Sequence, residues 1–183
     1  MEQKNKFDKK TVRAKQSPIG KGVYACQDFR PGDQIGPVSG RVIDDPQYGS
    51  NYCIDLGHER SLEPSTPFRY LNHGCEPNCQ LVVYDVEDDE GTLVYQKVFV
   101  EVLRPIQAGE QLLIDYAWPI EAAIPCLCGS SKCRGWVVGQ NLLDELRQKL
   151  TQTPTQEKKS KPKSKSGKKV HKTKKKCNGT NHE

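Results

Sequence analysis

Three cysteines lie close together late in the sequence. Cys126, Cys128 and Cys133 belong to the stretch CLCGSSKCRGW. Cysteine thiolates at such spacing are typical ligands of a structural zinc ion, and a closed zinc site takes four ligands in a tetrahedron. This stretch supplies three thiols, so a complete site needs a fourth ligand from another part of the chain.

Two further cysteines are near candidates for that fourth position. Cys75 and Cys79 both lie in RYLNHGCEPNC, and the spacing alone also leaves a more distant thiol open. Cys26 and Cys53 fall in segments with strand character and are expected to be core residues. The chain has eight cysteines and no apolar leader, which favours reduced thiols or metal ligands over disulfides, and an intracellular location.

The cysteine motif is the last of four motifs. It is preceded by SPIGKGVYACQDFRPGDQI (17–35), NHGCEPNC (72–79) and GEQLLIDY (109–116). Together the four resemble the SET-domain protein lysine methyltransferases that carry a C-terminal post-SET zinc motif. The resemblance extends from Val12 to about Gly139. It implies a mainly β SET-domain fold of several small sheets with a pseudoknot, followed by a zinc-bound post-SET segment and a short C-terminal helix.

The resemblance also implies a reaction and its residues. Members of the family methylate the ε-amine of a protein lysine with S-adenosylmethionine, so the chain is expected to be a protein-lysine N-methyltransferase. The implied catalytic residues are Tyr116, which would orient the methyl group, and Tyr52, which would line the lysine channel and bond the amine. The implied zinc ligands are Cys75, Cys126, Cys128 and Cys133. The implied cofactor-binding residues are Lys21, Gly22, Arg69, Asn72, His73, Tyr116 and Trp136.

Several of these residues have an ordinary structural alternative. Arg69 and Trp136 could equally serve packing, and Gly-Lys-Gly at 20–22 is on its own only a turn signal. The role implied for His73 is mainly through backbone contacts near the adenine, so it is not expected to act as a general base. Ile114 stands where many members have Phe or Tyr, and without a hydroxyl there we expect di- or trimethylation.

The segments that must position these residues have the pattern of short strands. They are rich in β-branched and aromatic residues between Gly, Pro and Asp, and comprise 22–26, 34–43, 51–56 and 111–118. Residues 81–103 predict a long hairpin around Asp-Asp-Glu-Gly. The absence of strand–helix alternation argues against a doubly wound parallel sheet. A helix is predicted over 141–150, with Asn141 as its N-cap and a leucine face packed on the body.

Composition divides the chain. We expect an N-terminal extension (1–11), the SET domain (12–118), the post-SET zinc segment (119–139), a helix (140–150) and a disordered Lys-rich tail (151–183). The tail has eleven lysines against two glutamates, a net charge of +9, which leaves about −4 of the chain's +5 for residues 1–150. Its stretch 158–176 predicts salt-sensitive, sequence-independent binding of nucleic acid, with a merely solvated charge run as the alternative. No apolar run approaches the ~20 residues of a membrane span.

The expected partner is a protein substrate with an accessible lysine, such as a histone or another basic protein of chromatin or the nucleoid. The location would then be the nucleus and chromosome in a eukaryote, or the cytoplasm and nucleoid in a bacterium. Two other functions stay open: a zinc-stabilised nucleic-acid-binding module, and a SET-like interaction protein without turnover. The presence of Tyr116, Asn72 and Tyr52 together argues against the first of these, because a scaffold does not need all three.

Overall fold

A computed structural model describes residues 11–17 and 20–152. The strands are β1 Val12–Ser17, β2 Gly20–Ala25, β3 Gln34–Pro37, β4 Gly40–Asp44, β5 Ile54–Gly57, β6 Arg60–Pro64, β7 Asn72–His73, β8 Cys79–Glu87, β9 Leu93–Val102 and β10 Leu113–Ile114. Short 3-10 turns occur at η1 Phe68–Tyr70, η2 Ile120–Ala122 and η3 Gln140–Leu142, and the α-helix is α1 Leu143–Gln152.

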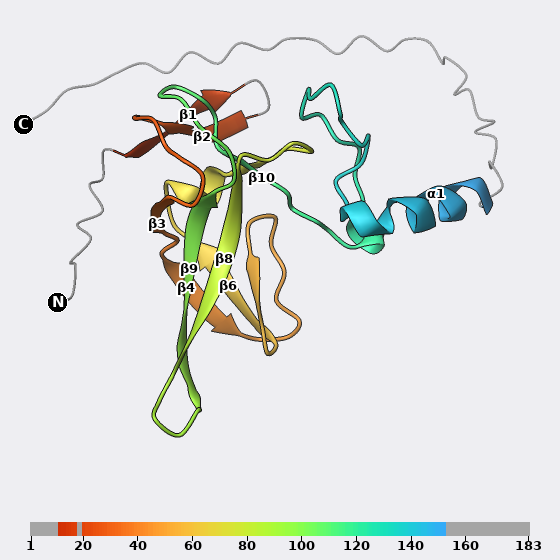
Figure 1. Ribbon diagram of the computed structural model, residues 1–183. Coiled ribbons are helices and arrows are strands. Elements are labelled where there is room, and N and C mark those ends of the chain that lie inside the picture. The colour runs from red at the N-terminus through yellow and green to blue at the C-terminus, as the bar shows by residue number, and fades with distance from the viewer. Residues whose placement is uncertain (1–10, 18–19, 153–183) are drawn as a thin grey trace, which may run out of the picture.

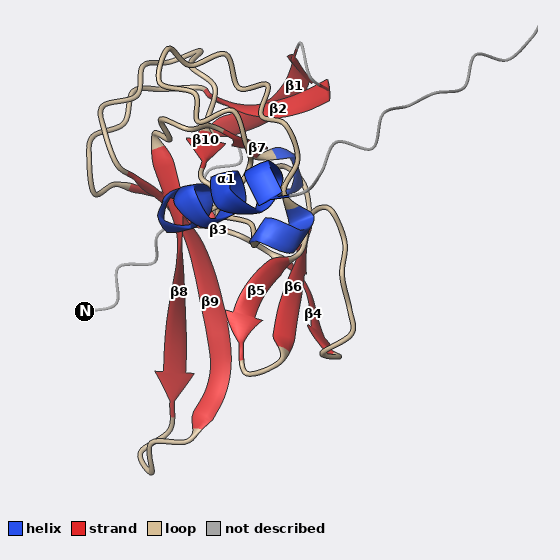
Figure 2. Cartoon of the chain, turned by 90° about the vertical axis from the view of Figure 1, so that its right-hand side faces the viewer, coloured by secondary structure: helices blue, strands red, loops and turns tan. Residues whose placement is uncertain are grey.

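The strands form four small sheets rather than one large one (Figures 1 and 2). β1 pairs with β2 and β7 with β10, and the two three-stranded sheets have the orders β3-β9-β8 and β4-β6-β5. Every pair is antiparallel except that of β7 with β10. The predicted mainly β fold of several small sheets is confirmed, and the described part of the chain has no doubly wound parallel sheet.

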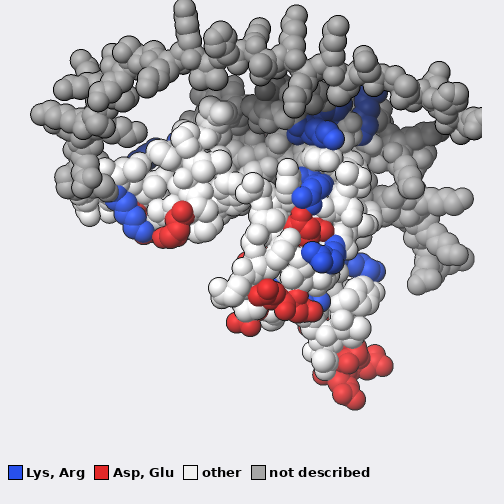
Figure 3. Space-filling view, turned by 180° about the vertical axis from the view of Figure 1, so that it is seen from behind, with Lys and Arg blue, Asp and Glu red and all other residues white. Residues whose placement is uncertain are grey.

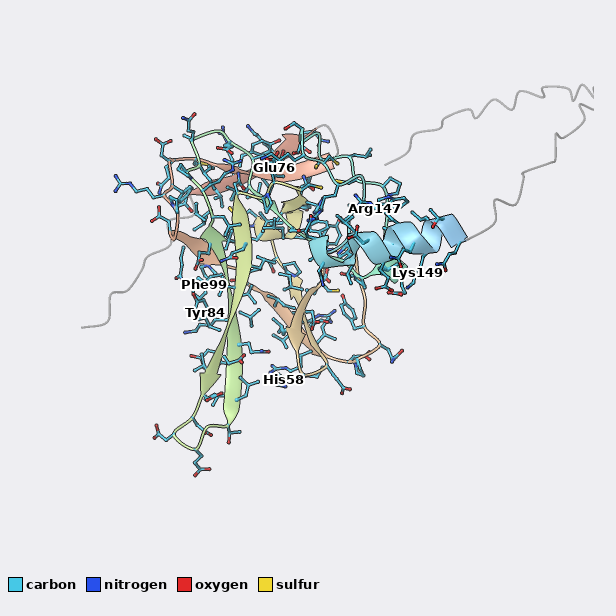
Figure 4. The ribbon with its side chains drawn as sticks, turned by 45° about the vertical axis from the view of Figure 1, so that its right-hand side comes forward. His58, Glu76, Tyr84, Phe99, Arg147 and Lys149 are labelled. Atoms are coloured by element: carbon cyan, nitrogen blue, oxygen red, sulfur yellow. The ribbon has the colours of Figure 1, made fainter. Side chains whose placement is uncertain are left out.

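The longest strands form the β8–β9 hairpin, as the alternation of residues predicted. It extends beyond the rest of the sheets (Figure 1). Val98, Val100 and Val102 of β9 point inward and are at most 3% exposed, because successive side chains of a strand point to opposite faces. On the outer face Tyr84 and Phe99 pack edge to face, with ring centroids 5.7 Å apart (Figure 4).

Apolar side chains from all four sheets meet in one core. It includes Val23 of β2, Leu62 of β6, Val100 of β9 and Ile114 of β10, which are all buried. Burial of such a side chain stabilises the fold by about 1.5–3 kcal/mol. Because the core joins segments that are far apart in the sequence, it holds the strand ends that carry the motifs in fixed relative positions.

The β7–β10 pair joins two of the motifs. Asn72 is aligned with Leu113 and His73 with Ile114, in parallel. The next residue, Gly74, donates its N–H to the Ile114 carbonyl oxygen at 2.9 Å, and a Cβ at Gly74 would lie 3.0 Å from the Leu113 side chain. This pairing is the one that the predicted pseudoknot requires, and it places the Asn72–His73 segment beside the strand that leads to Tyr116.

A fully buried asparagine ties the same crossing together. The side chain of Asn78 donates to the Gln111 carbonyl oxygen at 2.8 Å and accepts the Leu113 N–H at 2.8 Å. Its amide also donates to Glu110 Oε1 at 3.1 Å. A buried side-chain amide is costly unless it is hydrogen-bonded, and these three bonds satisfy most of its capacity.

The predicted strand over 111–118 is wrong in length. Only Leu113–Ile114 belong to a ladder. The carboxylate of Asp115 accepts the N–H of Ala117 at 3.0 Å, and Ala117 has a φ of 47°. An Asp side chain that bonds the backbone two residues on makes a turn, so the chain leaves the sheet immediately before Tyr116.

The expectation that Cys26 and Cys53 are core residues is also wrong. Cys53 is half-buried in a turn, where the Ser50 hydroxyl oxygen accepts the N–H groups of Tyr52 and Cys53 at 3.1 and 3.0 Å. For this reason β5 begins at Ile54 rather than at residue 51. Cys26 is exposed because it directly follows the last, inward-facing residue of β2.

The α-helix packs on a second, smaller apolar cluster in front of the sheets (Figure 2). Of the predicted leucine face, Leu143 and Leu146 are buried there against Val138, whereas Leu150 is exposed. The helix begins at Leu143, after a 3-10 turn that starts at Gln140 and has no side-chain cap, so the predicted N-cap at Asn141 is wrong. Asn141 lies inside that turn, whose N-cap position is Gly139, so it does not hold the non-helical flanking position of a cap.

The two charged ends of the chain fall mostly outside the described residues. The predicted extension 1–11 and tail 151–183 are described only at Thr11 and at Thr151 and Gln152, and the last two belong to α1. The nucleic-acid-binding prediction for 158–176 therefore lies outside the described residues. Within the described ranges, no helix is long and apolar enough to cross a membrane.

Candidate active site and cysteine cluster

A pocket of about 390 Å³ lies beside β5 and β10. Its walls include Tyr52, Arg69, Ile114, Tyr116 and Trp118. Three of the residues predicted from the sequence are thus brought together: both candidate catalytic tyrosines and Arg69. The lining is mixed in polarity, because the two phenols and several apolar side chains lie beside the carboxylates of Asp55 and Asp115.

Tyr116 is held from several directions. Its hydroxyl donates to the Leu71 carbonyl oxygen at 2.7 Å, and its N–H donates to His73 Nδ1 at 3.2 Å. Its ring lies 5.5 Å from that of His73 and 5.2 Å from that of Trp118, measured between centroids. Burial, with a smaller effect of Tyr52, raises the pKa of the Tyr116 phenol above its ordinary value of 10.0. The hydroxyl therefore keeps its proton at neutral pH and can act as a hydrogen-bond donor.

Tyr52 lies at the exposed side of the pocket, and its ring packs against the Arg69 guanidinium. Its ring is 43% exposed, and the Arg69 guanidinium carbon lies 3.9 Å from the ring centroid. Arg69 is ion-paired with Glu63, whose other oxygen accepts the hydroxyls of Ser50 at 2.6 Å and Tyr48 at 3.0 Å. In this structure Arg69 thus positions Tyr52, which is the packing alternative raised above.

Lys21, Gly22, Asn72 and His73 lie together outside that pocket, along β2 and β7. The Asn72 amide donates to the Lys21 carbonyl oxygen at 3.0 Å, and the Lys21 ammonium lies 4.9 Å from the Tyr70 ring centroid. Burial lowers the pKa of His73, so its ring is neutral at pH 7. The Tyr116 hydroxyl, bonded to Leu71 next to Asn72, connects this group with the pocket.

The expected Gly-Lys-Gly turn is a strand in the structure. Gly20 begins β2 and Gly22 lies inside it, paired with Lys15. A Cβ at Gly22 would lie 2.5 Å from Gln111 Nε2, a movable side-chain end, and 3.2 Å from Asn72 Nδ2, so the glycine lets both amides approach the backbone closely. Gln111 Nε2 is buried with no hydrogen-bond partner among the described residues. The side-chain amides of Gln111 and Asn72 therefore both lie against the backbone at Gly22.

The four predicted metal ligands form one cluster. The sulfur atoms of Cys75, Cys126, Cys128 and Cys133 all lie within 4.8 Å of one another. Cys75 Sγ is 3.6 Å from Cys126 Sγ and 4.0 Å from Cys133 Sγ. Four sulfurs at the ordinary Zn–S distance of about 2.3 Å from a central ion are about 3.8 Å apart, so the arrangement fits a tetrahedral zinc site.

The surroundings of Cys75 suit a metal-bound thiolate. Arg134 donates its backbone N–H to Cys75 Sγ at 3.3 Å, and His73 Nε2 lies 3.3 Å from the same sulfur. Hydrogen bonds to a ligand sulfur orient it and stabilise its negative charge. Cys79, the other near candidate, is fully buried in β8 outside the cluster, and burial raises the pKa of its thiol to about 12.

The two tryptophans lie in different surroundings, and the cofactor contact implied for Trp136 stays a prediction. Trp136 is half-buried and packs against the cluster of Val138, Leu143 and Leu146, and it is not among the residues that line the pocket. Trp118, which received no role from the sequence, lines the pocket and stacks beside Tyr116. No signal in residue type or spacing identified Trp118, because its position depends on the turn at Ala117.

A buried ion pair between the two motifs was also missed. The Arg134 guanidinium is 8% exposed and makes two bonds to Asp115, Nη1 to Oδ2 at 2.6 Å and Nη2 to Oδ1 at 2.7 Å. Burial by itself would raise the pKa of Asp115, but the bonds from Arg134 outweigh it and the pKa is lowered. Arg134 directly follows Cys133, so the pair joins the cysteine cluster to the residue before Tyr116.

Comparison with known proteins agrees with this arrangement. The SET domain family model matches residues 20–117. The histone-lysine N-methyltransferase set-2 of Caenorhabditis elegans is 32% identical over 149 residues, which cover 72% of this chain and 10% of that protein. Human SETD1B, also named a histone-lysine N-methyltransferase, is 33% identical over 116 residues, which cover 61% of this chain and 6% of that protein.

A solved structure shows the same fold. It is a crystal structure of a Plasmodium falciparum protein, PFL0690c, described as a histone methyltransferase, with a TM-score of 0.50 and 20% identity. The match covers 61% of this chain and 97% of that one. The chain itself spans a tenth or less of the length of the curated relatives named above. Since the family model matches more than half of its residues, the chain belongs to the SET-domain family.

Proposed function

We propose that the chain transfers a methyl group from S-adenosylmethionine to the ε-amine of a lysine in a histone or another basic protein. The observation that carries this proposal is the meeting of Tyr116, Tyr52 and the Leu71 carbonyl oxygen at one pocket. The names of the relatives, all histone-lysine N-methyltransferases, support the reaction and its class of substrate.

The backbone around Gly22 supports a cofactor site. When bound, S-adenosylmethionine supplies a methyl group on a positively charged sulfur, ready for displacement by an amine. The Asn72 amide and Gln111 Nε2 lie against the backbone at Gly22, and Gln111 Nε2 has no hydrogen-bond partner among the described residues, which supports a polar ligand there. Lys21, exposed beside Tyr70, adds a cation that suits a carboxylate.

The pocket residues prepare the lysine. The amine must be neutral to attack. Carboxylates in the lining, Asp55 and Asp115, attract the charged lysine, whereas the apolar side chains of Phe68 and Ile114 favour its neutral form. The hydrogen bond between Tyr116 and the Leu71 carbonyl oxygen fixes the Tyr116 ring at the place where the lysine amine and the methyl group must align. Positioning of this kind can supply several kcal/mol of a barrier. Tyr52, at the exposed side, can accept a hydrogen bond from an N–H of the incoming amine or donate one to its lone pair.

The pocket also supports more than one transfer to the same lysine. Ile114 is 7% exposed and lines the pocket with a branched alkyl group. It offers no hydrogen bond to a water molecule that would fill the space of a further methyl. We therefore propose di- or trimethylation as the outcome.

The cysteine cluster is proposed to hold one zinc ion with a structural role. All four positions of a tetrahedron are taken by protein sulfurs, which leaves no open position for a substrate. The ion would pin the segment after Tyr116 against β7, so metal binding would contribute directly to folding.

A basic partner also fits the charge of the described residues. Acidic side chains gather at the far end of the β8–β9 hairpin, where Asp88, Asp89 and Glu90 are exposed, and others lie over the neighbouring sheet (Figure 3). Such a surface attracts cationic proteins at long range and less so at high salt. A chromatin location follows from a histone substrate, and binding of nucleic acid by residues 158–176 stays a separate proposal.

The experiment is methyl transfer from isotopically labelled S-adenosylmethionine to a histone mixture and to a whole-cell lysate. The proposal predicts label on lysine side chains of a basic protein. If the folded, zinc-loaded protein labels nothing, the alternative of a binding module without turnover replaces it. Retention on nucleic acid, compared between the full chain and a chain ending at residue 152, then tests that alternative.

A further inference from the structure

Two segments that carry cysteines of the cluster also contact the chain at Tyr116. Arg134, directly after Cys133, makes two hydrogen bonds to Asp115. His73, two residues before Cys75, accepts the Tyr116 N–H. Both segments thus hold the backbone at and beside Tyr116, and both are anchored at cysteines of the cluster.

The Arg134–Asp115 pair is built for fixed geometry. Two parallel bonds between a guanidinium and a carboxylate define a plane, which a single bond from a lysine cannot do. The remaining Nε–H of Arg134 is buried without a hydrogen-bond partner among the described residues, so the two bonds to Asp115 involve only the Nη atoms. The Arg134 side chain is 8% exposed and that of Asp115 27%, so solvent reaches the pair only from the carboxylate side.

Asp115 uses the same carboxylate to shape the pocket wall. Its Oδ1 accepts the Ala117 N–H at 3.0 Å, and Ala117 has a φ of 47°, in the left-handed region that non-glycine residues rarely adopt. Such a conformation persists only when its surroundings hold it. Ala117 lines the pocket between Tyr116 and Trp118. Loss of the Asp115 contact would therefore relax the backbone that presents both rings.

The His73 ring makes the second connection. Because its Nδ1 accepts the Tyr116 N–H, the proton of the neutral ring lies on Nε2, which faces Cys75 Sγ at 3.3 Å. The ring is 6% exposed and has no room to turn away without breaking both contacts. The cluster thus reaches Tyr116 by two short hydrogen-bonded routes.

We propose that Arg134 is a positioning residue that couples metal occupancy of the cysteine cluster to the conformation of residues 115–118, and so to the placement of Tyr116. The inference rests on the proposed methyl transfer for its functional meaning. Coupling between two sites is reciprocal: if metal stabilises the ligand-ready pocket, a pocket ligand must tighten metal binding by the same factor. A cluster that served only to hold the fold together would show no such dependence on Arg134.

Hydrogen exchange of the full chain with and without zinc tests the coupling directly. In the wild type, zinc loading slows exchange of the amides at 115–118 by about tenfold or more. In Arg134→Gln, zinc loading slows exchange at 115–118 by less than about twofold. Residues 126–136 are still protected in this variant, which shows that zinc is bound. Arg147→Gln is the matched control, because Arg147 pairs with Asp144 on the exposed face of α1 (Figure 4) and should behave as wild type.

A second variant covers the case in which Arg134→Gln does not fold. Asp115→Asn keeps the size of the side chain and leaves every cluster residue in place, but removes the charge that Arg134 binds. It should retain one zinc per chain and lose the zinc-dependent protection of 115–118. Protection equal to wild type in either folded variant overturns the proposal.

Metal affinity supplies a readout that needs no turnover. S-adenosylhomocysteine should raise the zinc affinity of the wild type, measured by chelator competition, by about fivefold or more, and should not raise that of Arg134→Gln. Arg134→Lys should recover part of the effect through one of the two bonds. Equal factors in wild type and Arg134→Gln would again overturn the proposal.

Methyl transfer by the same wild-type preparation separates the two claims. If methyl transfer occurs and the zinc-dependent protection of 115–118 is the same in wild type and Arg134→Gln, the proposed function stands and the coupling is overturned. No transfer together with Arg134-dependent protection upholds the coupling and overturns the proposed function.

Discussion

The hydroxyl of Tyr116 donates a hydrogen bond of 2.7 Å to the carbonyl oxygen of Leu71, 45 positions earlier in the chain. Tyr116 lies two residues after β10, and Leu71 directly precedes Asn72, the residue of β7 that pairs with Leu113 of β10. The bond therefore lies where the pocket and the Asn72 segment meet. The predictions below test what each side of this contact does.

The cysteine cluster should bind one zinc ion per chain. Removal of the ion with a chelator should lower the melting temperature by about 10 °C or more, since zinc binding is folding free energy and each kcal/mol shifts the midpoint by about 2–4 °C at this chain length. Cys75→Ser should lose the metal, whereas Cys26→Ser, an exposed cysteine outside the cluster, should keep it. Metal analysis and thermal melting measure both. Full zinc content in Cys75→Ser would be incompatible with the assigned ligands.

Gly22→Ala should weaken cofactor binding more than it destabilises the fold. The new methyl would displace the Gln111 amide, a movable side-chain end, and would press on the Asn72 amide. We expect an affinity loss for S-adenosylhomocysteine of about tenfold, or about 1.4 kcal/mol, in isothermal titration. Gly49→Ala is the control, because a Cβ there meets nothing within 4 Å. An unchanged affinity in Gly22→Ala would remove the assignment of this backbone to the cofactor.

Ile114→Tyr should shift the products toward monomethyl-lysine. The larger side chain fills the pocket and adds a hydroxyl that can hold a water molecule where a methyl group would otherwise turn. Ile114→Val, which stays apolar and small, should keep the products of the wild type. Mass spectrometry at exhaustive turnover reads the outcome, and exclusively monomethyl product from the wild type would refute the proposed product.

The pH dependence should follow the substrate lysine and not Tyr116. Burial raises the pKa of the Tyr116 phenol above 10.0, so kcat/KM should rise from pH 7 to pH 9 as the lysine loses its proton, with no fall below pH 10. The same raised pKa favours the protonated form in the folded state. Its contribution to stability is therefore present below pH 10 and is lost as the pH rises through the folded-state pKa. A descending limb below about pH 9 would contradict this assignment.

The elements found from the sequence are those with a local signal. The β8–β9 hairpin follows from strict alternation on both sides of an acidic turn, and the leucine face of α1 from helical spacing. The strands near the site were predicted too long, because side chains of Ser50 and Asp115 bond nearby backbone N–H groups and end the ladders. Such local bonds depend on backbone geometry that residue type alone does not reveal.

The candidate site divides in the same way. The cysteine spacing indicated three ligands, and only the family resemblance singled out Cys75 from Cys79, which the structure places outside the cluster. The Arg134–Asp115 pair and the stacking of Trp118 on Tyr116 were not predicted. The first is a contact between segments whose approach depends on the tertiary fold, and the second depends on the turn at Ala117. Neither contact can be predicted from the periodicity or the composition of the sequence.

The central claim is that Tyr116 places the reacting groups for methyl transfer to lysine. The most direct measurement compares kcat for a labelled histone mixture in the wild type, Tyr116→Phe and Tyr95→Phe, with zinc content and melting temperature checked for each. Tyr95 is an exposed tyrosine on β9 and serves as the matched control. We predict a loss of about hundredfold or more in Tyr116→Phe and none in Tyr95→Phe. A folded, zinc-loaded Tyr116→Phe that labels lysines at the wild-type rate would contradict the account.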